Sequence, residues 1–227
     1  MVIALGVTLQ GRKVILGFVQ TASENERVIS QFLRELLGCG LKTGAGLLCV
    51  LDGAKGMRKA VLSVLGTGVM IQRCQWHKRE IVVEHLLKAQ QVVYRQKLQR
   101  GYEQPEYAQA KAALLRIRQE LRTINESAVR SLDDGLEETL TLHRLGVFPS
   151  LGTSLKTTNC LESLLAQVGQ RTDKVDRWQN SNQKQRWVAS ALLEIEPRLR
   201  RIRGYRYLPQ LRAALLARTE GSHLAAA

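Results

Sequence analysis

The sequence predicts an α/β protein in which strands of mixed direction are followed by a long helical region and a basic helical end. Three observations support this prediction. Apolar runs typical of strands alternate with helical patterns up to about residue 76, strand patterns then stop, and the chain becomes strongly basic after residue 162. Alternating strands and helices are typical of an α/β layer, and a hairpin at its start gives the sheet mixed directions.

Two apolar runs at the start, residues 2–9 and 13–20, predict a β-hairpin. A helix is expected next, with Ser23 and Glu26 as a capping box at its start and Gly38 at its end. Six apolar residues at helical spacing define its buried face. They are Val28, Ile29, Phe32, Leu33, Leu36 and Leu37.

Residues 47–51 form a nearly continuous apolar run, which is the pattern of a strand covered on both faces. A helix over residues 55–65 and a strand over residues 69–74 are expected to follow it. Together with the hairpin, these elements form the expected α/β core over residues 1–76.

Helical patterns replace strand patterns beyond this core. They cover residues 77–100, 107–127 and 136–145, with a break at residues 101–105. We therefore expect a helical insertion over residues 77–146. In the last part, residues 147–227, the Pro, Gly and Ser of residues 147–156 predict a loop, and a helix that carries Glu162 and further basic helices are expected after it.

The composition favours a polyanionic partner. The net charge is +14 and the isoelectric point is about 10.1, which points above all to nucleic acid; the alternative is a soluble protein that is merely basic. The region after residue 162 carries twelve basic and five acidic residues, half of this excess. No apolar stretch approaches the roughly 20 residues of a membrane span. Four scattered cysteines do not form a disulfide framework and favour a reduced, cytoplasmic setting.

Asp52 ends the apolar run of residues 47–51 and precedes Gly53. In open α/β sheets, ligands bind outside the carboxyl ends of strands, so a carboxylate here is well placed for a ligand. Gly53 would let a phosphate backbone approach closely. The alternative is an Asp that caps the next helix or begins a turn.

Glu162 lies three residues after Asn159, in the string Thr157-Thr158-Asn159-Cys160-Leu161-Glu162. This spacing predicts a capping box with Asn159 as the N-cap, which explains the Glu without any catalysis. A helix start is also a rigid place to hold a metal-binding carboxylate, so the two roles are compatible.

Cys74 and His77 have the Cys-x-x-His spacing and follow the expected strand directly. A structural zinc site usually needs two such pairs, and the sequence offers no second tight pair, so a buried Cys beside a polar His is the plain alternative. Trp178 and Trp187 lie among basic residues and could stack on bases. A place in the core is the favoured interpretation for both.

Taken in order, Asp52-Gly53, Cys74-x-x-His77 and Thr157-Thr158-Asn159-x-x-Glu162 resemble the catalytic core of mutator-type bacterial insertion-sequence transposases. The strings Ala4-Leu5-Gly6-Val7-Thr8 and Leu16-Gly17-Phe18 look like the second and third strands of the family's RNase H-like core. The resemblance implies an RNase H-like mixed sheet with a large all-helical insertion, followed by a basic helical part.

The family carries an Asp-Asp-Glu triad that holds two magnesium ions for DNA cleavage and strand transfer. The resemblance implies that Asp52 and Glu162 are catalytic metal ligands and that Cys74 and His77 support them. It also implies a DNA partner, both transposon ends and target, bound by basic residues. These are Lys78, Arg79, Arg171, Lys174, Arg177, Lys184 and Arg186. A homo-oligomer, or pairing with a full-length transposase, is expected in the bacterial cytoplasm at the nucleoid, with no membrane partner.

Two departures from the family pattern bear on activity. The strand with the first Asp should precede Val2, yet no acidic residue occurs before Glu24. Gly169 stands where the first of two family arginines is expected, ahead of Arg171. We therefore expect an amino-terminally truncated core fragment that is, alone, catalytically defective and only marginally folded, because an absent strand exposes ladder groups.

Two other interpretations remain open. The first is a non-catalytic DNA-binding or regulatory remnant that pairs with full-length transposase, and an upstream Asp-bearing strand in the native gene would argue against it. The second is a diverged RNase H-like nuclease without a role in transposition, which would need no terminal inverted repeats around its gene.

Overall fold

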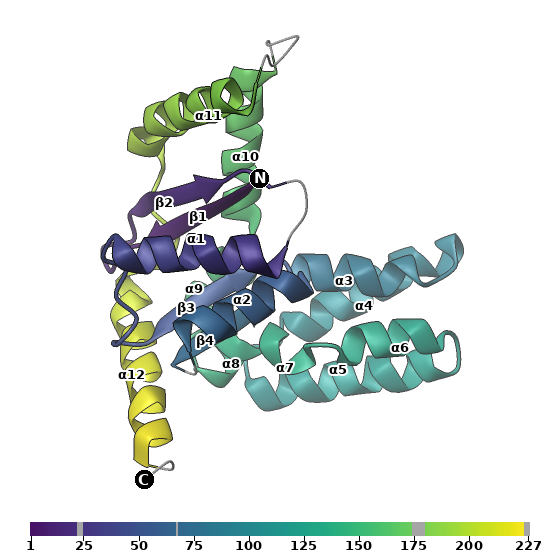
Figure 1. Ribbon diagram of the computed structural model, residues 1–227. Helices are drawn as coiled ribbons and strands as arrows, with labels where there is room; N and C mark the ends of the chain where they lie inside the picture. Colours follow the sequence, from purple (N-terminus) through teal and green to yellow (C-terminus); the bar gives the residue numbers. More distant parts are fainter. Residues whose placement is uncertain (22–24, 67, 174–179, 225–227) are drawn as a thin grey trace.

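The computed structural model describes residues 1–21, 25–66, 68–173 and 180–224. Strands β1 (Val2–Val7) and β2 (Lys13–Val19) form the predicted antiparallel hairpin, and β3 (Leu47–Leu51) pairs in parallel with β4 (Val69–Arg73) (Figure 1). The expected single mixed sheet is not formed by the described residues, in which the four strands make two separate two-stranded sheets.

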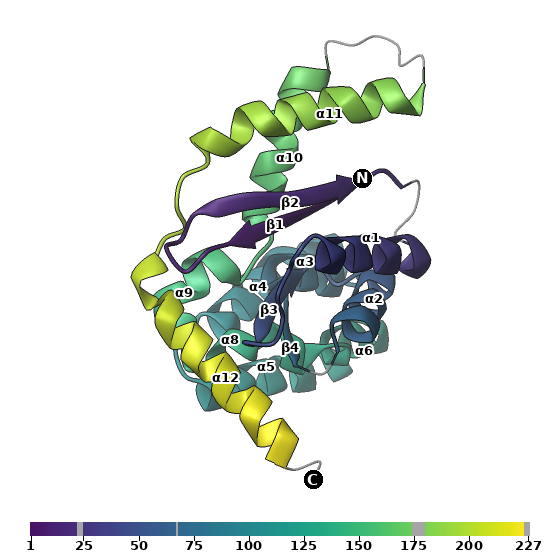
Figure 2. The same cartoon turned by 60° about the vertical axis from the view of Figure 1, so that its left-hand side comes forward.

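Helix α1 (Glu26–Gly38) lies between the hairpin and strand β3 in the view of Figure 1. A Cβ at Gly17 of β2 would lie only 3.2 Å from the ring of Phe32, while Leu33 packs in the cluster that holds Leu51 of β3. Helix α1 therefore packs on side chains of both sheets, and we call the two sheets together the layer. Strand β1 of the hairpin and strand β3 of the other sheet are the two strands that face each other in both Figure 1 and Figure 2.

The start of α1 differs from the prediction. Asn25 is the N-cap, and its side chain accepts a hydrogen bond from the Arg27 amide at 2.9 Å. Ser23, the predicted cap, lies outside the described residues. Gly38 is the last residue of the helix, as predicted.

The opposite face of the layer is covered by helices from the end of the chain. Ile3 and Leu5 of β1 pack with Leu164 of α10, whereas Leu48 and Val50 of β3 pack against α9 and α12. Strand β3 is thus covered on both faces, as its apolar run predicts. The predicted helix after it is α2 (Lys55–Leu65).

The middle of the chain is helical, as predicted, but divided more finely. Its helices are α3 (Gln75–Glu84), α4 (Lys88–Tyr102), α5 (Tyr107–Arg122), α6 (Glu126–Asp133), α7 (Leu136–Thr139) and α8 (Thr141–Arg144). Leu98, Leu114, Leu121 and Leu132 are fully buried in a core that is formed within this region alone. Asn125 begins α6 by accepting hydrogen bonds from two backbone amides, which explains why the helix predicted to residue 127 stops at Arg122.

The loop predicted over residues 147–156 is wrong, because helix α9 (Phe148–Leu155) occupies it. Pro149 lies in the first helical turn, where its missing N–H costs nothing. Phe148, Leu151 and Leu155 recur at helical spacing and are buried. Helices α10 (Asn159–Thr172), α11 (Ser181–Ile195) and α12 (Leu208–Leu224) follow. In the described part of the chain, no helix is long and apolar enough to span a bilayer.

Gly204 is a tightly packed glycine with left-handed backbone geometry. Its φ is +75°, and a Cβ there would lie 2.1 Å from the carbonyl oxygen of Ser150. Gly146 has nearly the same φ, +70°, with nothing near its Cβ position. Gly204→Ala should therefore lower the free energy of unfolding by about 2 to 5 kcal/mol, the sum of left-handed strain and overpacking. Gly146→Ala should cost about 1 to 2 kcal/mol from strain alone. Urea denaturation of both variants checks this, and equal losses would contradict it.

Candidate functional site

Strands β3 and β4 end side by side, which places the residues after them at one edge of the layer. Leu51 is opposite Arg73, and the Cys74 amide donates to the Leu51 carbonyl at 2.7 Å. Asp52 and Cys74 therefore follow neighbouring strands at the carboxyl end where ligands bind in open α/β sheets. One Asp52 carboxylate oxygen accepts from the Ala54 amide at 3.0 Å, so the turn role considered for Asp52 is present as well.

Arg73 fixes the turn after Asp52 to the helical insertion. Its guanidinium donates to the Gly53 carbonyl at 3.1 Å and to the Asp134 carbonyl at 2.7 Å, and it lies 3.0 Å from the Asp134 carboxylate. A Cβ at Gly53 would lie 2.5 Å from the Arg73 Nε. Glycine is thus required beside Asp52 by this arginine, and its φ of +112° requires it too.

Lys78, predicted to bind DNA, is instead a buried structural residue. Its exposed fraction is 1%, and its ammonium donates to the carbonyls of Ser131 at 2.6 Å and Asp134 at 2.5 Å. Burial lowers the pKa of Lys78 to about 8, with the nearby Arg73 acting in the same direction and Asp134 opposing both. A side chain held in this way is not available to a DNA phosphate, so the prediction for Lys78 is wrong.

Thr158 joins the two sequence motifs. Its hydroxyl lies 2.9 Å from the Glu162 Oε1, 3.3 Å from the His77 Nδ1 and 3.5 Å from the Cys74 Sγ. A hydroxyl has one hydrogen to donate and two lone pairs to accept with. The hydroxyl donates to the Glu162 carboxylate and can accept from the His77 Nδ1–H, while the Cys74 Sγ lies within reach of a weak hydrogen bond.

The structure thus brings Cys74, His77 and Glu162 together, although 84 residues separate Cys74 from Thr158. No role was predicted for Thr158 from the sequence. Its place directly before the helix that carries Glu162 marks it only as a helix start, and its burial, with 6% exposed, results from contacts that are distant in sequence. Buried hydroxyls need partners.

The helix start itself corrects one prediction. The N-cap of α10 is Thr158, and Asn159 is the first helical residue rather than the cap. Thr158 makes no side-chain bond to the backbone. Its hydroxyl is used by Glu162 instead, so the capping box predicted for Asn159 and Glu162 is not formed.

His77 lies between the buried Thr158 and the surface. Its side chain is 31% exposed, its Nε2 is 3.8 Å from the Glu162 Oε1, and its ring meets the exposed Trp76 edge-on at 4.8 Å. The Glu162 side chain is 44% exposed and open to a ligand. Among the described residues, no hydrogen bond or ion pair joins Glu162 to Asp52.

The donor chemistry of the site fits magnesium in kind but not in number. Asp52 and Glu162 offer the carboxylate oxygens that magnesium prefers. In the ranges that the structure describes, however, no three His, Cys, Asp or Glu side chains are grouped so that they could hold a metal ion. The same finding gives no support to zinc at Cys74 and His77.

The other predicted DNA-binding residues differ in their surroundings. Arg79 is paired with Glu80 at 2.9 Å, and Arg171 is paired with Glu194 at 3.2 Å. Lys184 and Arg186 are exposed on α11. Trp187 on the same helix is 47% exposed, so the expected core position is wrong for it. Lys174, Arg177 and Trp178 lie outside the described residues.

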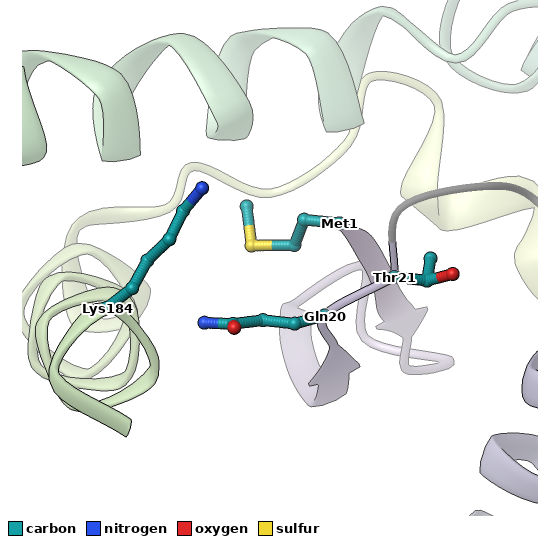
Figure 3. Close-up of a pocket in the computed structure, with 4 residues that line it drawn as sticks. All are labelled: Met1, Gln20, Thr21 and Lys184. Atoms are coloured by element: carbon teal, nitrogen blue, oxygen red, sulfur yellow. The ribbon is translucent and has the colours of Figure 1, made fainter. Parts of the chain in front are cut away.

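Lys184 also lines a surface hollow of about 240 Å³ beside the hairpin. Its other lining residues are Met1, Gln20 and Thr21, and Figure 3 shows the Lys184, Met1 and Gln20 side chains directed toward one another. Asp52 and Glu162 do not line it. The hollow is therefore separate from the cluster around Thr158.

Comparisons with known proteins show the family of the chain. The family described as "Transposase, Mutator family" matches residues 1–199. The transposase for IS256 in transposon Tn4001 of Staphylococcus aureus is 26% identical over 195 residues, which cover 85% of this chain and 48% of that protein. The transposase for IST2 of Acidithiobacillus ferrooxidans is 30% identical over 176 residues, covering 77% of this chain and 57% of that protein. The transposase for ISRM5 of Rhizobium meliloti is 29% identical over 192 residues, which cover 85% of this chain and 47% of that protein. The chain spans about half the length of these relatives.

Proposed function

Because this chain belongs to the Mutator family of transposases, we propose that it forms part of a catalytic core that cuts DNA at transposon ends and joins the 3′ hydroxyl to target DNA. The observation that carries the proposal is the contact of Thr158 with Cys74, His77 and Glu162. It gathers residues of two distant motifs at the edge of the layer where Asp52 also lies.

In this proposal Asp52 and Glu162 would hold magnesium. Bound magnesium ions, two in the complete site, would activate the attacking oxygen and stabilise the leaving oxygen. The residues of this chain position the site: Arg73 fixes the turn after Asp52, and Thr158 fixes the Glu162 carboxylate. Cys74 and His77 support Glu162 through the same hydroxyl.

We also propose that the two small sheets are parts of one RNase H-like mixed sheet. Within the described residues β1 pairs only with β2, and β3 pairs only with β4. Helix α1 covers one face of both pairs, and α9, α10 and α12 cover the other. A further strand between β1 and β3 would complete the layer and could carry the third carboxylate of the site.

The proposed division of the chain follows the same plan. Residues 1–76 form the α/β core, residues 77–146 form the helical insertion, and residues 147–227 carry the Glu162 helix and the basic end. The separate core of the middle helices supports this division. DNA is the proposed partner of the basic end, which implies action on bacterial DNA in the cytoplasm.

A non-catalytic, DNA-binding role is the alternative. It is favoured by one observation, that the described residues supply two acidic ligands and no group able to hold a metal. Such a chain would bind DNA, or a full-length transposase, and modulate the reaction without performing it.

Strand transfer by the chain extended with an Asp-bearing amino-terminal strand distinguishes these roles. We expect magnesium-dependent joining of a 3′-hydroxyl oligonucleotide to a plasmid, reduced to background by either Asp52→Asn or Glu162→Gln. Asp133→Asn is the matched control, because Asp133 pairs with Arg118 in the helical insertion, at 2.6 Å. Joining that survives both site substitutions would contradict the proposed roles. DNA binding without joining would favour the non-catalytic alternative.

A further inference from the structure

An arginine segment connects α11 to α12 and lies almost entirely beyond the residues that match the family. It comprises Arg198, Arg200, Arg201, Arg203 and Arg206, all exposed. The family match ends at residue 199. The segment passes the turn of the β1–β2 hairpin and then reaches α12 (Figure 2). The family match therefore does not account for the positive charge of this segment.

The backbone of the arginine segment is fixed by three contacts. The Ile202 amide donates to the Gly11 carbonyl at 3.0 Å, and the Arg203 carbonyl accepts from the Ser154 hydroxyl at 3.0 Å. Gly204 fits against Ser150 with no room for a side chain. Ile202 is 5% exposed and packs in the core beside α12. The arginine side chains therefore project from a rigid base.

Two of these arginines converge on one uncharged group. The Arg201 guanidinium carbon lies 5.3 Å from the centre of the Tyr205 ring. Hydrogen bonds and charge from Arg206, and then from Arg201, lower the pKa of the Tyr205 hydroxyl. Arg201 and Arg206 therefore both act on Tyr205, and among the residues that the structure describes no ion pair joins either of them to a carboxylate.

Within the described ranges, most arginines of this segment lack an acidic partner, unlike several arginines elsewhere in the chain. Arg58, Arg118 and Arg171 each lie within 4 Å of a carboxylate. In the described part of the chain, Arg198 pairs with Glu194 at 3.3 Å, but no ion pair joins a carboxylate to the other four arginines of the segment. An external anion would balance this charge.

We propose that the arginine segment binds the phosphate backbone of DNA without regard to base sequence, with Arg201 and Arg206 together holding one phosphate. This rests on the proposed function, which makes DNA the polyanion at hand. Guanidinium groups match phosphate geometry, and phosphate contacts carry no direct sequence information. A membrane surface is less suited, because the apolar residues Ile202 and Leu208 face the core, where they are 5% and 6% exposed.

The test compares two double variants of the full chain that remove the same charge. Arg201→Gln/Arg206→Gln alters the proposed clamp, and Arg116→Gln/Arg122→Gln alters exposed arginines of α5. Fluorescence anisotropy with a labelled duplex of random sequence measures the dissociation constant from 50 to 200 mM salt, without magnesium. We expect the clamp variant to bind roughly 10- to 100-fold more weakly and to lose about 0.9 from the slope of log affinity against log salt. The control should keep the slope.

Each other outcome overturns the proposal. Equal losses in both variants would mean that only net charge matters, and no loss in either would mean that DNA lies elsewhere. Equal or tighter binding to phosphatidylserine vesicles, lost in the same variant, would assign the segment to a membrane surface. If the clamp variant fails to fold by circular dichroism, Arg200→Gln/Arg203→Gln replaces it, with the same expected loss. Because binding is measured without magnesium, failure of the catalytic proposal leaves this result unchanged.

Discussion

Joining an Asp-bearing strand of about six residues ahead of residue 1, through a short turn, is expected to raise the free energy of unfolding by about 3 to 6 kcal/mol. The gain comes from burial of its apolar side chains and from backbone hydrogen bonds, and it is partly offset by ordering of the added residues. The same extension should give the chain magnesium-dependent DNA joining, since it supplies the third carboxylate.

The physical reason lies in the inner edges of the two sheets. Unpaired strand edges leave backbone groups without ladder partners and are prone to pair with other chains. Strand β1 has six residues and β3 has five, so an inserted strand of similar length can pair with both. The helices that would cover it, α1 on one face and α10 on the other, are already in place.

Hydrogen exchange and urea denaturation measure this result. Amides of β1 and β3 that face the inner edges should exchange rapidly in the chain alone and become protected in the extended chain. The control is the same extension with a central Pro, which cannot pair and should give neither stability nor protection. A second control with Asn in place of its Asp should gain stability without activity. Equal exchange in the original chain, the extended chain and the Pro control would show that no strand enters the layer.

The local sequence patterns of this chain predict its helices and strands better than they predict how these pack together. Strands of five to seven residues are found where apolar runs predict them. For β3, coverage of both faces accounts for the continuous apolar run. Residues 148–155 were predicted as loop because Pro and Gly dominate the local pattern. Their helix depends on burial of Phe148 and Leu151 against α12, which is distant in sequence.

The site shows the same limit. Asp52 and Glu162 stand where the sequence predicts, at a strand end and in the first turn of a helix. Lys78 was assigned to DNA because charge usually marks a surface, yet its partners are carbonyls more than fifty residues away. The role of Thr158 depends on contacts of similar range, which no local spacing encodes.

Replacing Thr158 by Val is expected to lower the joining activity of the strand-extended chain about 10- to 100-fold, the usual effect of losing a group that orients a metal ligand. Valine has nearly the shape of threonine but no hydroxyl. The Glu162 carboxylate would lose the hydrogen bond of 2.9 Å, and the His77 Nδ1 would lose its partner. Thr158→Ser keeps the hydroxyl and should retain most of the activity.

A spectroscopic measurement separates this positioning role from a general loss of stability. If the His77 Nδ1–H donates to Thr158, the neutral ring must carry its hydrogen on Nδ1. Nitrogen-15 chemical shifts of labelled histidine, recorded where the ring is neutral and assigned with His77→Gln, report this tautomer. The original chain and Thr158→Ser should show Nδ1–H, and Thr158→Val should show a mixture. An unchanged tautomer in Thr158→Val, with activity also unchanged, would mean that the hydroxyl only fills space. If Thr158→Ser keeps both the tautomer and the activity while Thr158→Val loses both, the geometry of Glu162 and His77 depends on one oxygen atom.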